Sequence, residues 1–128
     1  MKFPVVSDVS PAGSPQASPA DARQGDCFGQ WYAQGDRWAT GGAYDRALRC
    51  FEEAAILAPE DVETLIYQAV CLIHLERPQR ALAVAERVLA IAPDHPQGWL
   101  YRGVALHRLG RYQEAYASYA QVQPSSVS

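Results

Sequence analysis

The sequence has few of the features that build membrane spans or disulfide frameworks. No segment is apolar for long enough to cross a bilayer, and the first residues are too strongly interrupted by Pro4 and Asp8 to form a secretory signal. The three cysteines are odd in number and form no CxxC motif, which favours small, buried, reduced thiols. We therefore expect a cytoplasmic protein that does not insert into membranes.

Lysine is almost absent, since ten arginines accompany a single lysine, a bias typical of GC-rich bacterial genomes. The net charge is −3. Residues 1–63 carry five basic and ten acidic side chains, whereas residues 64–128 carry six basic and four acidic ones. Nucleic-acid binding would need a clustered basic stripe, so we expect no nucleic-acid partner. The mild charge asymmetry can orient a partner protein or support head-to-tail association.

Patterns for catalysis and metal binding are also missing. The three histidines, His74, His95 and His107, have no cysteine or carboxylate at ligand spacing. The sequence shows no acid–base pair at catalytic spacing, no nucleophile with an assigned base, and no glycine loop that could cradle a phosphate. We expect no metal, no cofactor and no enzymatic activity.

The first 24 residues differ in composition from the rest of the chain. Half of them are proline, serine or alanine, and no apolar period is visible among them. Such a composition cannot bury enough apolar surface to fold by itself. We predict that residues 1–24 form a disordered leader.

A period of 34 residues runs through most of the remaining chain. Large, small and again large residues recur at fixed positions, followed by alanines and a closing proline. The recurring sets are Trp31, Leu65 and Trp99; Gly35, Ala69 and Gly103; Trp38, Leu72 and Leu106; Ala47, Ala81 and Ala115; Ala54, Val88 and Val122; and Pro59 with Pro93. Within each unit the spacing i, i+4, i+7 places these side chains on one face of a helix, so the pattern predicts two short core-facing helices per period.

The expected helix boundaries agree with the period. Gly41-Gly42 and Gly110 stand where a helix end needs a residue that tolerates positive φ. Pro59 and Pro93 should close the second helices, and Asp61 or Asp94 can cap the helix that follows. Pro78 and Pro96 fit the first turn of a helix, because no N–H is needed there.

These residues together resemble the tetratricopeptide repeat, over about Phe28 to Val122. The resemblance implies an all-α fold: a right-handed superhelical α-α solenoid of three helix-turn-helix units, with a disordered N-terminal tail. We place the repeat domain at residues 25–123, with repeats at about 28–61, 62–95 and 96–123, and a tail at 124–128.

Several positions depart from the pattern of that family. Gln34, Gln68 and Arg102 stand where the family usually has leucine, so part of the seam between successive first helices is expected to be polar. Ala85 replaces the ring found in the other two units, which leaves a gap or lets Tyr101 lean into the space.

A second stripe runs along the first helices beside the core stripe, and in this family the corresponding positions line a concave groove that holds a partner segment. The stripe is aliphatic in the second and third units and is flanked by two tyrosines. The predicted groove residues are Tyr32, Asp36, Ile66, Tyr67, Val70, Ile73, Leu100, Tyr101, Val104 and His107. The structural alternative is that these residues are buried by the chain itself, by its leader or by a second copy.

We predict a non-catalytic protein-interaction module, an adaptor or small chaperone, that binds a helical or extended apolar segment of another protein or peptide. Its groove resembles that of small bacterial three-repeat chaperones such as those serving type III secretion. The carboxylate clamp of some family members needs lysines, asparagines and an arginine, whereas this chain has Tyr32, Asp36, Tyr67, Gln97 and Tyr101 at those places. The alternative is a homo-oligomeric structural protein that buries the groove, or the third repeat with its Tyr112, Tyr116 and Tyr119, against itself.

Overall fold

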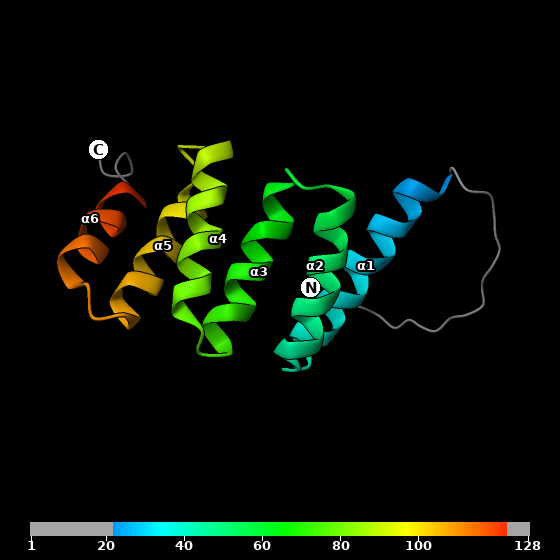
Figure 1. The fold of residues 1–128 in the computed structure, drawn as a ribbon, viewed down its shortest axis with the longest axis horizontal. Helices are drawn as coiled ribbons and strands as arrows, with labels where there is room; N and C mark the ends of the chain where they lie inside the picture. The colour runs from blue at the N-terminus through cyan, green and yellow to red at the C-terminus, as the bar shows by residue number, and fades with distance from the viewer. Residues whose placement is uncertain (1–21, 123–128) are drawn as a thin grey trace. The chain divides into compact units, whose positions relative to one another are not determined.

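The computed structural model describes residues 22–122, which form six α-helices and no strand. The helices are α1 (Ala22–Thr40), α2 (Tyr44–Leu57), α3 (Val62–His74), α4 (Pro78–Ile91), α5 (Pro96–Arg108) and α6 (Tyr112–Val122), as Figure 1 shows. The all-α prediction is confirmed. The helix α1 begins inside the predicted leader, while residues 1–21 of that leader and the predicted tail at 124–128 lie outside the described residues.

The predicted turn glycines and helix-initiating prolines occupy their expected places. Gly42 and Gly110 adopt φ of 87° and 82°, in the left-handed region that glycine tolerates best. The helices α4 and α5 begin at Pro78 and Pro96. The turn between α3 and α4 reaches the same conformation without glycine, since Glu76 has a φ of 62°.

Only one of the two predicted aspartate caps forms. The Asp61 carboxylate accepts hydrogen bonds from the Thr64 backbone N–H at 3.0 Å and from the Thr64 hydroxyl at 2.6 Å. The expected cap by Asp94 is wrong, because the N-cap of α5 is His95, whose Nδ1 accepts a 3.4 Å hydrogen bond from the Gly98 backbone N–H. An imidazole nitrogen therefore performs the role that the sequence assigned to a carboxylate.

The chain divides into two compact units, the first ending at Pro59 and the second beginning at Glu60. The first unit holds one hairpin, in which α1 packs along α2. The two helices approach closely at Gly35, where a Cβ atom would lie 2.8 Å from the Phe51 ring. Phe51 is fully buried and also meets Tyr32 edge to face, with ring centroids 5.7 Å apart.

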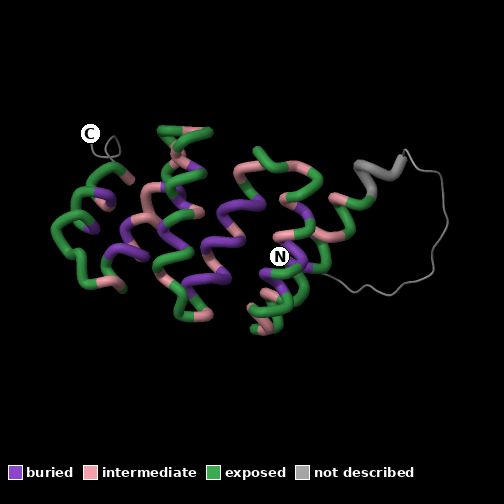
Figure 2. Tube along the Cα trace, viewed as in Figure 1, coloured by how far each residue is buried: buried purple, intermediate pink, exposed green. Residues whose placement is uncertain are grey.

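The second unit holds two hairpins that pack on each other. The helix α4 lies against both α3 and α5, α5 lies against α6, and α3 also reaches α5 (Figure 1). Leu65, Ile66 and Val88 form a buried cluster, and Val70 and Tyr101 are among the side chains that pack against it. Buried positions run along α3 and the inner sides of α4 and α5 (Figure 2).

The small residues of the repeat act where helices of one hairpin touch. At Gly103 a Cβ atom would lie 2.5 Å from the Tyr119 ring and 3.2 Å from the Ala115 carbonyl oxygen. The middle repeat has Ala69 and Ala85 at the equivalent positions, and both are fully buried. Tyr101 packs against the buried cluster of Leu65, Ile66 and Val88.

Three polar residues were expected along the seam between successive first helices; Gln34 is exposed, and the bonds of Arg102 run to the second helices α4 and α6. Gln68 is 7% exposed. The Arg102 Nη1 donates a 2.6 Å hydrogen bond to the buried Ser118 hydroxyl, and its Nε lies 3.4 Å from the Glu86 carboxylate. Arg102 thereby connects α5 to both α4 and α6.

Two expected core residues are exposed. The Trp38 side chain is 38% exposed; it lies in the last turn of α1, and the Arg46 guanidinium of α2 lies 4.9 Å from its ring centroid. The Cys27 side chain is exposed as well, whereas Cys50 and Cys71 are buried as predicted. Periodicity placed Trp38 on the core stripe but does not indicate that its side chain is more than a third exposed.

Candidate functional site

The predicted groove residues belong to two different units. Tyr32 and Asp36 lie on α1 in the first unit. The others lie on α3 and α5 of the second unit: Ile66, Tyr67, Val70, Ile73, Leu100, Tyr101, Val104 and His107. The second unit therefore carries most of the predicted set on two helices that contact each other.

Two of the aliphatic residues predicted for the groove are buried in the single chain. Ile66 is 3% exposed and belongs to the core cluster with Leu65 and Val88. Ile73 is 6% exposed, and its carbonyl oxygen accepts a 3.3 Å hydrogen bond from Arg108 Nη1, which joins the ends of α3 and α5. These two residues belong to the core, and almost none of their surface is accessible to a partner.

The remaining aliphatic residues are half-buried. Val70 on α3, and Leu100 and Val104 on α5, each keep part of their surface accessible. Val70 and Tyr101 pack against the same buried cluster, so side chains of α3 and α5 meet there. We define the α3–α5 face as Tyr67, Val70, Leu100, Tyr101, Val104 and His107.

Two tyrosines set the polarity of this face. Burial raises the pKa of the Tyr101 hydroxyl above its usual value of 10.0, and the nearby Tyr67 hydroxyl raises the pKa further. The two hydroxyls are therefore close enough to influence each other. Neutral hydroxyls beside aliphatic side chains form a surface that accepts an apolar segment and can hydrogen-bond its backbone.

His107 joins the α3–α5 face to an aromatic cluster on α6. Its ring meets Tyr112 edge to face at a centroid distance of 5.0 Å and lies 6.4 Å from Tyr116. The side chains of Tyr112 and Tyr116 are 51% and 58% exposed. The sequence indicated tyrosines near the end of the third repeat, but their contact with His107 could not be read from spacing within one helix.

In the first unit, the two predicted residues lie next to the ring cluster of that hairpin. Tyr32 is half-buried between Phe28 and Phe51, with centroid distances of 5.8 Å and 5.7 Å. Asp36 follows one turn later, and burial raises the pKa of its carboxyl above the usual value of 3.8. A negative group at this position opposes the binding of a carboxylate there.

The described residues contain no group of three or more histidine, cysteine, aspartate or glutamate side chains arranged to hold a metal ion. Within the same range, none of the helices combines the length and apolar character needed to cross a membrane.

The family comparison agrees with the repeat pattern. Two profiles, both described as tetratricopeptide repeat, match residues 32–96 and residues 71–125. No curated protein matches the sequence significantly.

Several solved structures share the arrangement of the helices. The second TPR of Spaghetti (RPAP3), bound to the HSP90 peptide SRMEEVD, has 16% identity and a TM-score of 0.73, covering 79% of this chain and 95% of that one. The Arabidopsis OM64 TPR domain has 21% identity and a TM-score of 0.74, covering 80% and 87%. The Yersinia enterocolitica type III secretion chaperone SycD, in complex with a peptide of the translocator YopD, has 17% identity and a TM-score of 0.73, covering 77% and 76%. At these identities the likeness establishes the fold alone.

Proposed function

This chain belongs to the tetratricopeptide-repeat family, and we propose that it is a non-catalytic, cytoplasmic protein-interaction module. Its ligand is an apolar helical or extended segment of another protein, and the α3–α5 face is the surface that takes up this segment. The observation that carries the proposal is the half-buried aliphatic surface of Val70, Leu100 and Val104 beside the tyrosine pair.

The energetics of such a surface suit reversible binding. Covering about 400 Å² of apolar area would contribute about 10 kcal/mol at about 25 cal/mol per Å². Ordering the segment and losing its free rotation costs an amount of similar size. We therefore expect affinities in the micromolar range, which are suitable for an adaptor or a small chaperone.

The structural relatives support a peptide-like partner. The Spaghetti domain is bound to an HSP90 peptide, and the Yersinia SycD chaperone is bound to a YopD peptide. For this chain an apolar segment, as opposed to an acidic terminus, is favoured on the α3–α5 face, because Tyr67 and Tyr101 are neutral there. Asp36 on α1 would repel a carboxylate.

Paired substitutions on this face test the proposal. Val70→Asp with Val104→Asp should abolish capture of the partner from a lysate of the native host, because two charges would be desolvated on binding. A matched control, Ile91→Asp with Ala117→Asp, places the same charges at exposed positions of α4 and α6 and should leave capture intact. Circular dichroism verifies that each protein is folded, and Val70→Ala with Val104→Ala is the milder version of the test. Equal capture by the aspartate pair and the control would overturn the proposal.

The exposed aromatic cluster favours a second candidate function, a homo-oligomer that covers the third repeat. Tyr112 and Tyr116 present large side chains that are more than half exposed. Sedimentation at low micromolar concentration separates the two candidates. A dimer that Tyr112→Ser with Tyr116→Ser dissociates would establish self-association, and a clean monomer would remove it.

A further inference from the structure

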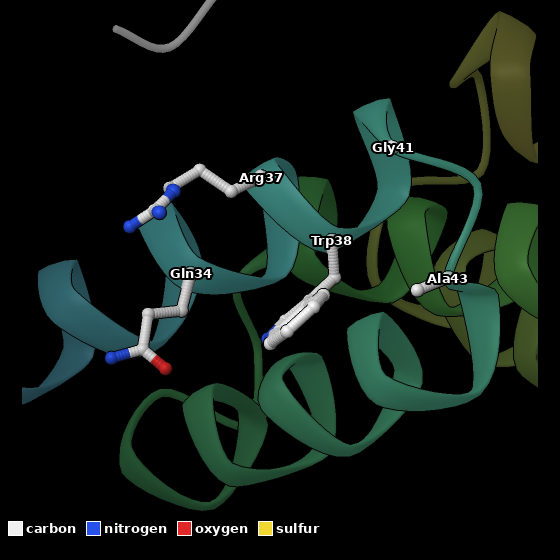
Figure 3. Close-up of a pocket in the computed structure, with 5 residues that line it drawn as sticks. All are labelled: Gln34, Arg37, Trp38, Gly41 and Ala43. Atoms are coloured by element: carbon white, nitrogen blue, oxygen red, sulfur yellow. The ribbon is translucent and has the colours of Figure 1, made fainter. Parts of the chain in front are cut away.

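A second surface feature lies on a different side of α1 from Tyr32 and Asp36. A cavity of about 300 Å³ is lined by Gln34, Arg37, Trp38, Gly41 and Ala43, all from the first unit. Gln34 follows Tyr32 by two residues, which is roughly 200° around the helix, so this cavity and the predicted groove residues of α1 face different directions. Figure 3 shows Gln34 and Trp38 extending in the same direction from α1, one turn apart.

The cavity combines an accessible indole with the Arg37 guanidinium, and the guanidinium of Arg46, which is not a lining residue, lies over the indole. Trp38 is 38% exposed, and the Arg46 guanidinium lies over its ring at 4.9 Å. Arg37 is exposed at the rim, where Figure 3 shows its side chain extending from the same stretch of α1. Among the described residues, neither Arg37 nor Arg46 has a carboxylate partner.

The backbone N–H groups at this cavity are already used in hydrogen bonds within the chain. The N–H groups of Gly41, Gly42 and Ala43 donate to the carbonyl oxygens of Arg37, Ala39 and Trp38. A ligand would therefore be recognised by side chains. These are the Trp38 indole, the Gln34 amide and the Arg37 guanidinium, with the Arg46 guanidinium over the indole.

We propose that this Trp38 pocket is a binding site for a short acidic peptide segment, in which a large apolar side chain lies beside one or two carboxylates. The apolar side chain packs on the indole, and the carboxylates pair with Arg37 and Arg46. The volume of about 300 Å³ lies at the lower end of the range for small-ligand pockets and is enough for one large side chain.

A peptide is favoured over a nucleic acid by the small number of cations at the site. Arg37 and Arg46 supply two guanidinium groups, whereas a nucleic-acid backbone would need a longer row of basic side chains. Two guanidinium groups suffice for two carboxylates.

Nuclear magnetic resonance of the indole N–H groups in the full chain tests this proposal. The chain has three tryptophans, and the signal that disappears in Trp38→Phe identifies Trp38. The probe is a capped tripeptide phenylalanine–glutamate–glutamate, and its neutral match is phenylalanine–glutamine–glutamine. We expect the glutamate probe to shift the Trp38 signal saturably and to bind roughly fivefold more tightly than the glutamine probe, as one or two exposed ion pairs would produce.

Two charge-neutralising variants complete the test. Arg37→Gln should weaken the glutamate probe by roughly fivefold, while Arg49→Gln, the same change at an exposed position of α2 outside the pocket, should leave binding unchanged. Equal binding of the two probes, equal effects of the two variants, or no shift of the Trp38 signal at millimolar probe would overturn the proposal. A single-stranded oligonucleotide that binds more tightly than the glutamate probe would overturn the assignment to a peptide.

The site is independent of the α3–α5 face. The Val70→Asp with Val104→Asp chain should bind the glutamate probe as the unchanged chain does, provided that it remains folded. Failure of the groove proposal and failure of the pocket proposal are therefore distinguishable.

Discussion

At the scale of single residues, helix packing within a hairpin depends on a small residue that faces a larger one. Gly35 faces the Phe51 ring, and Gly103 faces the Tyr119 ring, with no room for a Cβ atom in either case. The middle repeat has alanine at both equivalent positions, Ala69 and Ala85. Glycine therefore occurs in the two repeats whose opposite residue is aromatic, whereas the middle repeat pairs two alanines, which together fill less volume.

The contact between Gly103 and Tyr119 predicts that substitutions at these two positions change the free energy of unfolding non-additively. Gly103→Ala should destabilise the second unit by about 1–3 kcal/mol, because the new Cβ atom overpacks against Tyr119. Adding Tyr119→Ala recreates the alanine pair, so the double variant should be more stable than the sum of the single effects implies. Thermal unfolding followed by circular dichroism measures all three.

Gly29→Ala is the control for this cycle. Nothing lies within 4 Å of a Cβ atom at Gly29, which is inside α1, so the change should stabilise the chain by about 0.5–1 kcal/mol. A Gly103→Ala chain that gains stability in the same way would show that Tyr119 moves aside without cost.

Part of the residue-scale detail was predictable and part was not. The turn glycines Gly42 and Gly110 follow from the chemistry of positive φ. Glu76 adopts the same conformation without any sequence signal, because the hairpin geometry imposes it on whichever residue stands there. His95 instead of Asp94 caps α5, since a shift of one residue changes which side chain reaches the helix N-terminus.

At the scale of helices, Arg102 is the polar link of the second unit. It joins α5 to α6 through the Ser118 hydroxyl and to α4 through Glu86. Ser118 is fully buried, whereas the Glu86 side chain is 52% exposed, so the two links differ in strength. The bond to the buried hydroxyl should dominate, because solvent screens the exposed pair.

Arg102→Met should therefore destabilise the chain by about 1–3 kcal/mol, because it leaves the Ser118 hydroxyl buried without this donor. Glu86→Gln should change stability by less than about 0.5 kcal/mol. Urea unfolding gives both values, and amide hydrogen exchange should show the loss for Arg102→Met concentrated in α6. Similar effects of the two variants would contradict this ranking.

The period of 34 residues predicted the helices well but not every exposed face. The helix α3 is buried around much of its circumference, including Ile66 and Ile73, which the second stripe assigned to the groove. An apolar residue on such a helix satisfies the core and the groove pattern equally, so periodicity cannot separate them. Val70, Leu100 and Val104 remain as the accessible part of the prediction.

At the scale of the whole molecule, repetition determines the family and leaves function to the surfaces that the repeats do not use. The spacing that repeats within this chain accounts for the hairpins of both units. The α3–α5 face and the Trp38 pocket differ in character. The first is aliphatic with neutral hydroxyls, and the second combines the Trp38 indole with the Arg37 guanidinium.

Cysteine labelling on the α3–α5 face tests the central claim, that this face is open in the free chain and is covered by a partner. In a Cys27→Ser background, where Cys50 and Cys71 are buried, Val104→Cys supplies a reporter and Gln113→Cys an exposed control. The account predicts that a maleimide labels both positions in the free chain, and that the captured partner protects position 104 but not position 113. An unreactive cysteine at position 104 in the free chain, or equal labelling there with and without the partner, would contradict it.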